Sequence, residues 1–190
     1  MVAAAATGGT IKVTNVIPKH LESISAKLEE SGSIVEEFGD AVIVTGRSKI
    51  RKANVKTHPY PGFPTDMQPQ MATLLTVADG TSIVSEGVWD NRFKYIDQFI
   101  RMGAKVQVDG KTAVITGVEK LSPAPVKAVD LRAGAAMIIA GLMARGTTEI
   151  EDIIYIDRGY ENFVEKFRDL GADMYRKEFD DNNKTTVSAG

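Results

Sequence analysis

Two arginines occupy matching positions in the sequence, where helices are predicted to begin. Arg92 lies eleven residues after Thr81, and Arg158 lies eleven residues after Thr147. A cation near the N-terminus of a helix opposes the helix dipole, so these arginines suit contact with an anionic ligand better than they stabilise the helix. The alternative is that each arginine pairs with a nearby carboxylate, and the residue types leave both interpretations open.

Two aspartates also stand at predicted helix starts. Asp66 follows a proline-rich segment, residues 58–64, and Asp130 opens the sequence Asp130-Leu131-Arg132. An aspartate in this position typically accepts hydrogen bonds from free backbone N–H groups of the first turn, and we expect both to do so. Asp130 and Arg132 could form a local ion pair, or together hold a phosphate group.

Composition excludes several kinds of site. The 190 residues include no cysteine and two histidines, so a disulfide, a thiolate metal site and a histidine-based zinc site are not expected. The sequence has no Walker loop, dinucleotide fingerprint or nucleophile elbow. We therefore expect neither a metal nor a cofactor.

Charge and hydropathy indicate where such a protein would act. With 23 basic and 25 acidic side chains the formal charge is -2, which gives no reason to expect nucleic acid or a membrane as partner. The apolar start, residues 1–6, is too short for a signal peptide or a membrane span. A soluble cytoplasmic protein is the expectation.

A repeat positions the candidate residues. A Gly-Thr pair followed by a β-rich run begins at residues 9, 80 and 146, with spacings of 71 and 66 residues. An amphipathic helix follows each pair, over residues 20–31, 93–102 and 160–170, and each helix meets a glycine that can end it in a left-handed conformation. Two short strands come next, predicted at 34–38 and 41–45 in the first unit and at 105–108 and 113–116 in the second.

A second helix leads from one unit into the next. We expect such helices at residues 66–78 and 130–144, and residues 2–6 resemble the last turns of a third, so the chain is expected to start partway through an element. The third unit offers one strand, 173–179, before a polar tail, 180–190, that we expect to be disordered. The sequence thus predicts a single α/β domain over residues 1–179, with units near 1–65, 66–129 and 130–179 and three sheets around a buried helical core.

Four separated segments resemble the UDP-N-acetylglucosamine 1-carboxyvinyltransferases of the enolpyruvyl transferase family. They are PGFPTDMQPQ from Pro61, NRFKYIDQFIRMGA from Asn91, VEKL and DLRAGAA between Val118 and Ala136, and IDRGYENFVEKFRDLGA from Ile156. The resemblance covers roughly residues 1–178. It implies an α/β (α+β) inside-out barrel domain of about three βαβαββ repeats, facing a second, similar domain across a cleft.

The resemblance also implies a reaction. Enzymes of this bacterial family transfer the enolpyruvyl group of phosphoenolpyruvate to the 3-hydroxyl of UDP-N-acetylglucosamine, the first committed step of peptidoglycan synthesis and so of cell wall biogenesis, cell shape and cell division. Asp66 resembles the residue proposed as general base, a role that requires burial to raise its pKa. The other matching positions resemble substrate contacts: an apolar one at Val88, arginines of the phosphoenolpyruvate and phosphate site at Arg92 and Arg158, and a pair beside the reacting phosphate at Asp130 and Arg132.

The family's catalytic cysteine, which is an aspartate in some members, belongs to the N-terminal domain that has no counterpart in this sequence. We therefore expect the chain alone to be inactive. One alternative is a non-catalytic isolated or engineered domain that self-associates through the face left exposed. Another is a relative that acts on shikimate 3-phosphate, although the DMQ context of Asp66 and the IDRGYE motif favour the sugar-nucleotide enzyme.

Overall fold

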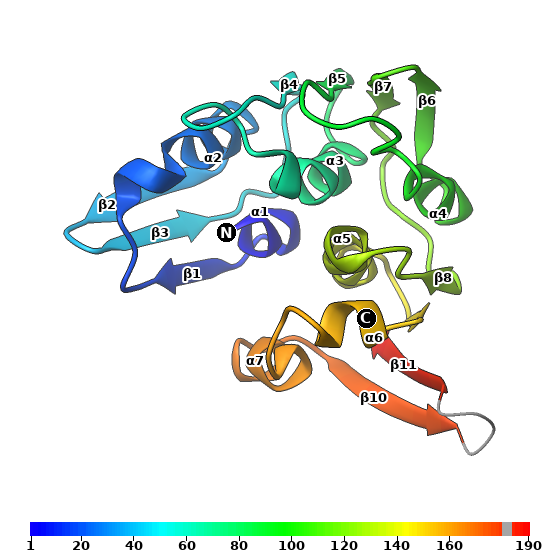
Figure 1. Ribbon diagram of the computed structural model, residues 1–190. Helices are drawn as coiled ribbons and strands as arrows, with labels where there is room; N and C mark the ends of the chain where they lie inside the picture. The colour runs from blue at the N-terminus through cyan, green and yellow to red at the C-terminus, as the bar shows by residue number, and fades with distance from the viewer. Residues whose placement is uncertain (180–183) are drawn as a thin grey trace.

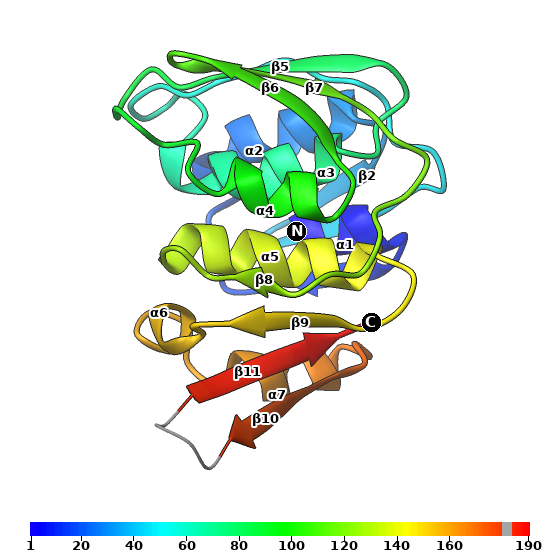
Figure 2. The same cartoon turned by 90° about the vertical axis from the view of Figure 1, so that its right-hand side faces the viewer.

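The computed structural model describes residues 1–179 and 184–190, which form three β-sheets around three central helices (Figure 1). α1 (Val2–Thr7), α3 (Gln68–Leu75) and α5 (Leu131–Met143) pack against one another, and Figure 2 shows them between the sheets. Every residue of α3 is buried, and α5 contributes small buried residues that let the helix backbones approach closely. The expected arrangement of three sheets around a helical core is confirmed.

The first unit follows the sequence pattern closely. Its sheet has the order β1-β3-β2, all antiparallel, and α2 covers it. The strands β2 and β3 have the predicted bounds, because two short β-rich runs flank the Gly39-Asp40 turn and define them locally. The bounds are β1 (Thr10–Val13), α2 (Pro18–Glu30), β2 (Ile34–Phe38) and β3 (Ala41–Thr45).

The second and third units each add a short strand that the sequence analysis missed. β4 (Val55–Lys56) pairs in parallel with β5 (Thr81–Ser85), and β8 (Val126–Lys127) pairs in parallel with β9 (Thr148–Glu151). Strands of two residues are too short to show alternation, and they form because a neighbouring strand supplies the hydrogen bonds. Each of these units thereby has the βαβαββ order that the resemblance implies, and each sheet begins earlier in sequence than residues 66 and 130.

The remaining elements complete two four-stranded sheets, ordered β4-β5-β7-β6 and β10-β11-β9-β8. In the second unit they are η1 (Thr65–Met67), β5 (Thr81–Ser85), α4 (Ile96–Arg101), β6 (Lys105–Asp109) and β7 (Thr112–Thr116). In the third unit they are β9 (Thr148–Glu151), α6 (Ile154–Asp157), α7 (Phe163–Asp169), β10 (Met174–Phe179) and β11 (Lys184–Ala189).

Several expectations about helix and strand ends are wrong. The predicted helices 93–102 and 66–78 are shorter than expected, since α4 spans Ile96–Arg101 and α3 spans Gln68–Leu75. The predicted helix 160–170 begins only at Phe163, because Asn162 has a φ of 48°, outside the helical region. The predicted disordered tail is wrong for residues 184–189, which form β11 between β10 and β9, with Val187 and Ala189 buried. The rest of that prediction, residues 180–183, lies outside the described residues. By contrast, the left-handed glycines expected after the amphipathic helices are confirmed at Gly32, Gly103 and Gly171.

None of the helices in the described part of the chain is both long and apolar enough to cross a membrane.

Candidate active site

The site forms where α3 and α5 begin, and Figure 1 views both helices nearly end-on. Asp66 lies in η1, a single 3₁₀ turn directly before α3. Pro64, which has an extended backbone, precedes this turn. Gly62 allows the tight path of the proline-rich segment, since a Cβ there would lie 2.5 Å from the Cβ of His58. This path presents Asp66 at the surface, with its side chain 53% exposed.

The expected helix-capping role of Asp66 is wrong. No side chain caps η1 or α3, because the 3₁₀ turn separates Asp66 from the first turn of the α-helix. Its carboxylate instead accepts hydrogen bonds from two guanidinium groups. Arg132 binds it with two donors, Nε to Oδ1 at 2.7 Å and Nη2 to Oδ2 at 2.8 Å, and Arg92 adds Nη2 to Oδ1 at 2.8 Å.

Both partners are distant from Asp66 in the sequence: Arg132 lies 66 residues after it and Arg92 lies 26 residues after it. Two positively charged guanidinium groups therefore surround one carboxylate. The group of three carries a net positive charge, which favours the binding of anions. We call Asp66, Arg92 and Arg132 the arginine cluster. The pKa of Asp66 is lowered, chiefly because Arg132 donates hydrogen bonds to the ionised form; partial burial opposes the shift, and the charges of Arg132 and Arg92 add to it. The condition of a raised pKa for a general base is therefore not met in this arrangement.

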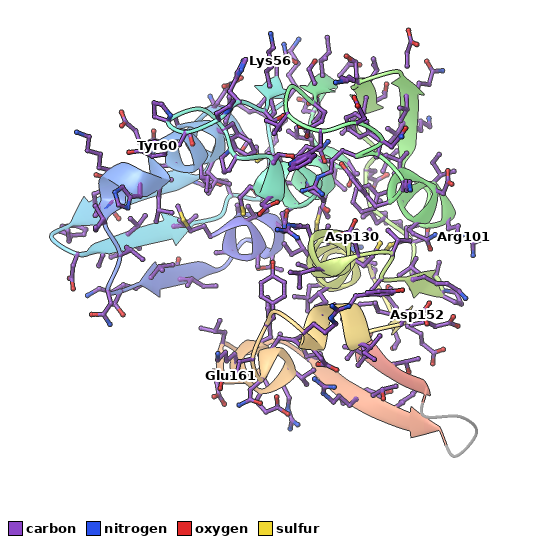
Figure 3. All side chains as sticks on the ribbon, in the orientation of Figure 1. Lys56, Tyr60, Arg101, Asp130, Asp152 and Glu161 are labelled. Carbon is purple, nitrogen blue, oxygen red and sulfur yellow. The ribbon has the colours of Figure 1, made fainter. Side chains whose placement is uncertain are left out.

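Asp130 does cap its helix, as predicted. Its Oδ1 accepts hydrogen bonds from the backbone N–H groups of Arg132 and Ala133, both at 2.8 Å. Arg132 pairs with Asp66 and not with its neighbour Asp130, because its guanidinium group is directed to the Asp66 carboxylate. Figure 3 places Asp130 at the centre of the molecule where α5 begins, whereas Tyr60, in the proline-rich segment, lies farther out near α2.

Buried polar atoms without a partner gather beside the arginine cluster. Nε of Arg92 is buried and unpaired, as are Nε2 of Gln68 and Oε1 of Gln70 in the first turn of α3. The other amide atom of Gln68, Oε1, accepts a hydrogen bond from the buried hydroxyl of Tyr95 at 2.7 Å. Unpaired buried polar atoms are costly, and a polar ligand could satisfy these three, two at the start of α3 and one in the loop before α4.

Arg158 lies apart from the cluster. It follows α6 and is exposed, and no carboxylate pairs with it among the residues described. Its acidic neighbour Asp157 is bound instead by Arg176, with N–O distances of 3.0 and 2.5 Å. The guanidinium of Arg158 is therefore available to an anionic ligand, although the structure does not bring it into contact with Asp66.

The segment after Arg158 is held close to α5. A Cβ at Gly159 would lie 2.8 Å from both methyl groups of Leu131, so a larger residue would require the Leu131 side chain to move. Tyr160 follows, and burial raises its pKa while the nearby charge of Arg132 opposes the shift. Sequence analysis quoted Tyr160 within a motif but gave it no role, since nothing in the local pattern shows that it lies near Arg132.

Val88 lies in the loop between β5 and α4 and is 37% exposed. That loop is held by Glu86, a buried carboxylate that the sequence analysis also missed. The only signal for it in the sequence was an acidic residue shortly after a β-rich run, residues 82–84. Among the described residues, no group of three or more histidine, aspartate or glutamate side chains is placed to hold a metal ion.

Comparison with known proteins identifies relatives along nearly the whole chain. Residues 1–167 match the family model of EPSP synthase (3-phosphoshikimate 1-carboxyvinyltransferase). A UDP-N-acetylglucosamine 1-carboxyvinyltransferase of Clostridium botulinum is 58% identical over 176 residues, which cover 93% of this chain and 42% of that protein. Another, from Desulfofundulus thermocisternus, is 52% identical over 181 residues, covering 95% of this chain and 74% of that protein.

Solved structures agree in fold. The enolpyruvyl transferase NikO from Streptomyces tendae superposes with a TM-score of 0.79 at 26% identity, over 90% of this chain and 42% of that one. EPSP synthase from Acinetobacter baumannii superposes with a TM-score of 0.68 at 17% identity, over 98% of this chain and 44% of that one. A likeness at this identity supports the fold alone. Most of these relatives are more than twice as long as the part that this chain matches. The chain thus belongs to the EPSP synthase family of carboxyvinyltransferases.

Proposed function

We propose that this chain is the part of a UDP-N-acetylglucosamine 1-carboxyvinyltransferase that bears the candidate base Asp66 and binds the sugar nucleotide. The observation that carries the proposal is the arginine cluster, in which residues from two repeat units meet at the starts of two buried helices. The names of relatives more than 50% identical support the choice of sugar nucleotide over shikimate 3-phosphate. The reaction moves the enolpyruvyl group of phosphoenolpyruvate to the sugar 3-hydroxyl.

The cluster suggests how substrate could prepare Asp66. Arginine stays charged and can grip a phosphate group with two donors, so a phosphate would compete with Asp66 for the guanidinium groups of Arg132 and Arg92. Asp66 would then lose the hydrogen bonds that lower its pKa, and the carboxylate would become a better acceptor for the proton of the 3-hydroxyl. The pairing in the ligand-free chain would thus hold both the base and the phosphate-binding groups in readiness.

The other candidate residues take supporting roles in this proposal. Arg158, which has no carboxylate partner among the residues described, would add a third guanidinium for phosphate. Val88 would contact the sugar nucleotide through its exposed methyl groups. Asp130 would fix the start of α5, and with it the backbone that carries Arg132.

The proposal extends to parts that this chain does not contain. The matched relative of Clostridium botulinum is covered over 42% of its length, so a second domain would supply the acid that protonates the enolpyruvyl carbon. We propose residues 1–179, together with β11, as one domain, inactive by itself and using no metal or cofactor. Its setting would be the bacterial cytoplasm and peptidoglycan synthesis, hence cell wall biogenesis, cell shape and division, without a nucleic acid or membrane partner.

Titration of the ¹⁵N-labelled chain with UDP-N-acetylglucosamine tests the proposal. We expect shifts at the amides of Asp66 and Val88, saturation with increasing ligand, and loss of binding in Arg132→Ala. Shikimate 3-phosphate serves as the competing ligand, and tighter binding of that compound would favour the alternative substrate. A phosphate-release assay with both substrates should show no turnover. Robust turnover by this chain alone would overturn the proposal that it carries only part of an active site.

Self-association through an exposed face is the other candidate role. Sedimentation of the chain over a wide concentration range tests it, because a self-associating domain gains mass with concentration. A chain that stays monomeric at every concentration would favour the proposal that it carries part of a transferase active site.

A further inference from the structure

Glu86 is a buried carboxylate that accepts four hydrogen bonds. The residue follows β5 and is 3% exposed. Oε1 accepts from the Thr57 hydroxyl at 2.7 Å and from the backbone N–H groups of Val88 and Trp89 at 2.9 and 3.1 Å. Oε2 accepts from the Thr65 hydroxyl at 3.0 Å. Among the described residues, no lysine or arginine pairs with Glu86.

The four donors belong to the two segments that carry the candidate active site. Thr65 directly precedes Asp66, and it lies with Thr57 on either side of the proline-rich segment. Val88 and Trp89 begin the loop that leads to Arg92. Glu86 therefore connects the backbone that positions Asp66 with the backbone that positions Arg92.

Backbone packing at the same place reinforces this connection. Thr57 Oγ1 accepts a hydrogen bond from the N–H of Gly87 at 2.8 Å, while donating its own proton to Glu86. A Cβ at Gly87 would lie 2.4 Å from the carbonyl oxygen of Thr57. The two segments therefore approach more closely than any residue other than glycine at position 87 would allow. The hydrogen bonds that Glu86 accepts are thus part of a tightly determined loop geometry.

A contribution to stability alone does not account for a charge in this place. Burying a carboxylate without a cation is costly, and a well-packed apolar residue of similar volume often serves a protein equally well. A carboxylate has only acceptors, and it can satisfy donors from several segments at once. Its use here fits a requirement for one fixed geometry of both segments.

We infer that Glu86 is a positioning residue that sets the distance between Asp66 and the loop carrying Val88 and Arg92. The inference rests on the proposed function, since it assigns Glu86 to the same sugar-nucleotide site. Glu86 does not contact the substrate in this account; it acts through the two segments that it joins.

The test compares Glu86→Gln with Glu86→Ala in the full chain. Glutamine keeps an oxygen for the donors of Oε1, and its NH₂ group can donate to the Thr65 hydroxyl, which is free to rotate. Alanine leaves all four donors without a partner. Ile115→Val, a buried change in β7 of the same sheet, serves as the control for a general loss of stability.

Two measurements do not depend on the substrate. Trp89 is the only tryptophan of the chain, so its fluorescence reports the loop directly. We expect Glu86→Ala to change the Trp89 emission and to speed amide exchange at Val88 and Trp89 by about tenfold or more, because their hydrogen bonds are lost. Core amides of α3 and α5 should exchange as before, and Glu86→Gln and Ile115→Val should match the unsubstituted chain.

The third measurement is binding of UDP-N-acetylglucosamine. We expect about tenfold or more weaker binding in Glu86→Ala, with affinity largely kept in Glu86→Gln and in the control. Should Glu86→Ala fail to fold, Thr65→Val removes the single donor of Oε2 and should shift the Asp66 signals while leaving Val88 and Trp89 protected.

Several outcomes would overturn the inference. Unchanged exchange and fluorescence in Glu86→Ala would show that Glu86 does not hold the loop. Equal loss of binding in Ile115→Val would show that only general stability matters. If the unsubstituted chain does not bind the sugar nucleotide at all, the proposed function fails, whereas the exchange data still decide whether Glu86 fixes the loop.

Discussion

Replacing Asp130 separates helix capping from charge at the start of α5. Oδ1 of Asp130 accepts two backbone N–H groups, each at 2.8 Å, in the first turn of that helix. Asp130→Ala removes both bonds, whereas Asp130→Asn keeps an oxygen in the same place. Because asparagine and aspartate cap helices about equally well, the pair differs mainly in charge.

The structure sets the size of the effect. Loss of an aspartate cap costs about 1 kcal/mol, within a range of about 0.5–2 kcal/mol. We expect the upper half of that range here, because most of α5 is buried and the helix cannot shift to find another cap. For a domain of this size, 1 kcal/mol corresponds to a fall in melting temperature of about 2–4 °C.

Urea unfolding measures the free energy of unfolding of each variant, followed by circular dichroism and by the fluorescence of Trp89. The expected order places Asp130→Asn close to the unsubstituted chain and Asp130→Ala lower by about 1–2 kcal/mol. Asp109→Ala is the matched control, since Asp109 is exposed and caps no helix. Equal stability of Asp130→Ala and Asp130→Asn would refute the reasoning, because it would mean that the observed cap bonds contribute nothing.

Three further changes test the site and the core. The pKa of Asp66 is lowered, so its pairing stabilises the fold fully above the ordinary value of 3.8 and is lost as the pH falls through the folded-state pKa. A ¹³C titration of the Asp66 carboxyl should therefore give a midpoint below 3.8 that rises in Arg132→Ala, and an unmoved midpoint would contradict the pairing. Because Asp66 is half exposed, that pairing should contribute only ~0.5–1 kcal/mol to stability in a double-mutant cycle. Gly134→Ala should destabilise by about 1–3 kcal/mol in urea, since its Cβ would lie 2.5 Å from Cγ1 of Ile156; a neutral result would mean that α6 moves freely. Leu75→Ala, at a fully buried position of α3, should cost about 2–5 kcal/mol by the same measurement, and a cost below 1 kcal/mol would argue against a packed helical core.

Local patterns in the sequence were enough for most of the secondary structure. The hairpin of β2 and β3 was predicted with its observed bounds, and the glycines ending three helices have the left-handed conformation expected of them. The short strands β4 and β8 were missed because their pairing depends on strands distant in the sequence. β11 was mistaken for a disordered tail because its polar residues Thr186 and Ser188 become buried only against the third sheet.

Spacing and side-chain character are local properties, so the repeat, the helical core and the types of residue available for chemistry could be predicted from the sequence. It also placed Arg92 and Arg158 at one equivalent position of the repeat, and Asp66 and Asp130 at another. Which of the candidate side chains meet depends on the tertiary fold. Asp66 binds Arg92 and Arg132 rather than capping its own helix, and Arg158 remains apart. The physical reason is that an ion pair depends on distance in space, and packing three repeats around one core sets those distances independently of separation along the chain.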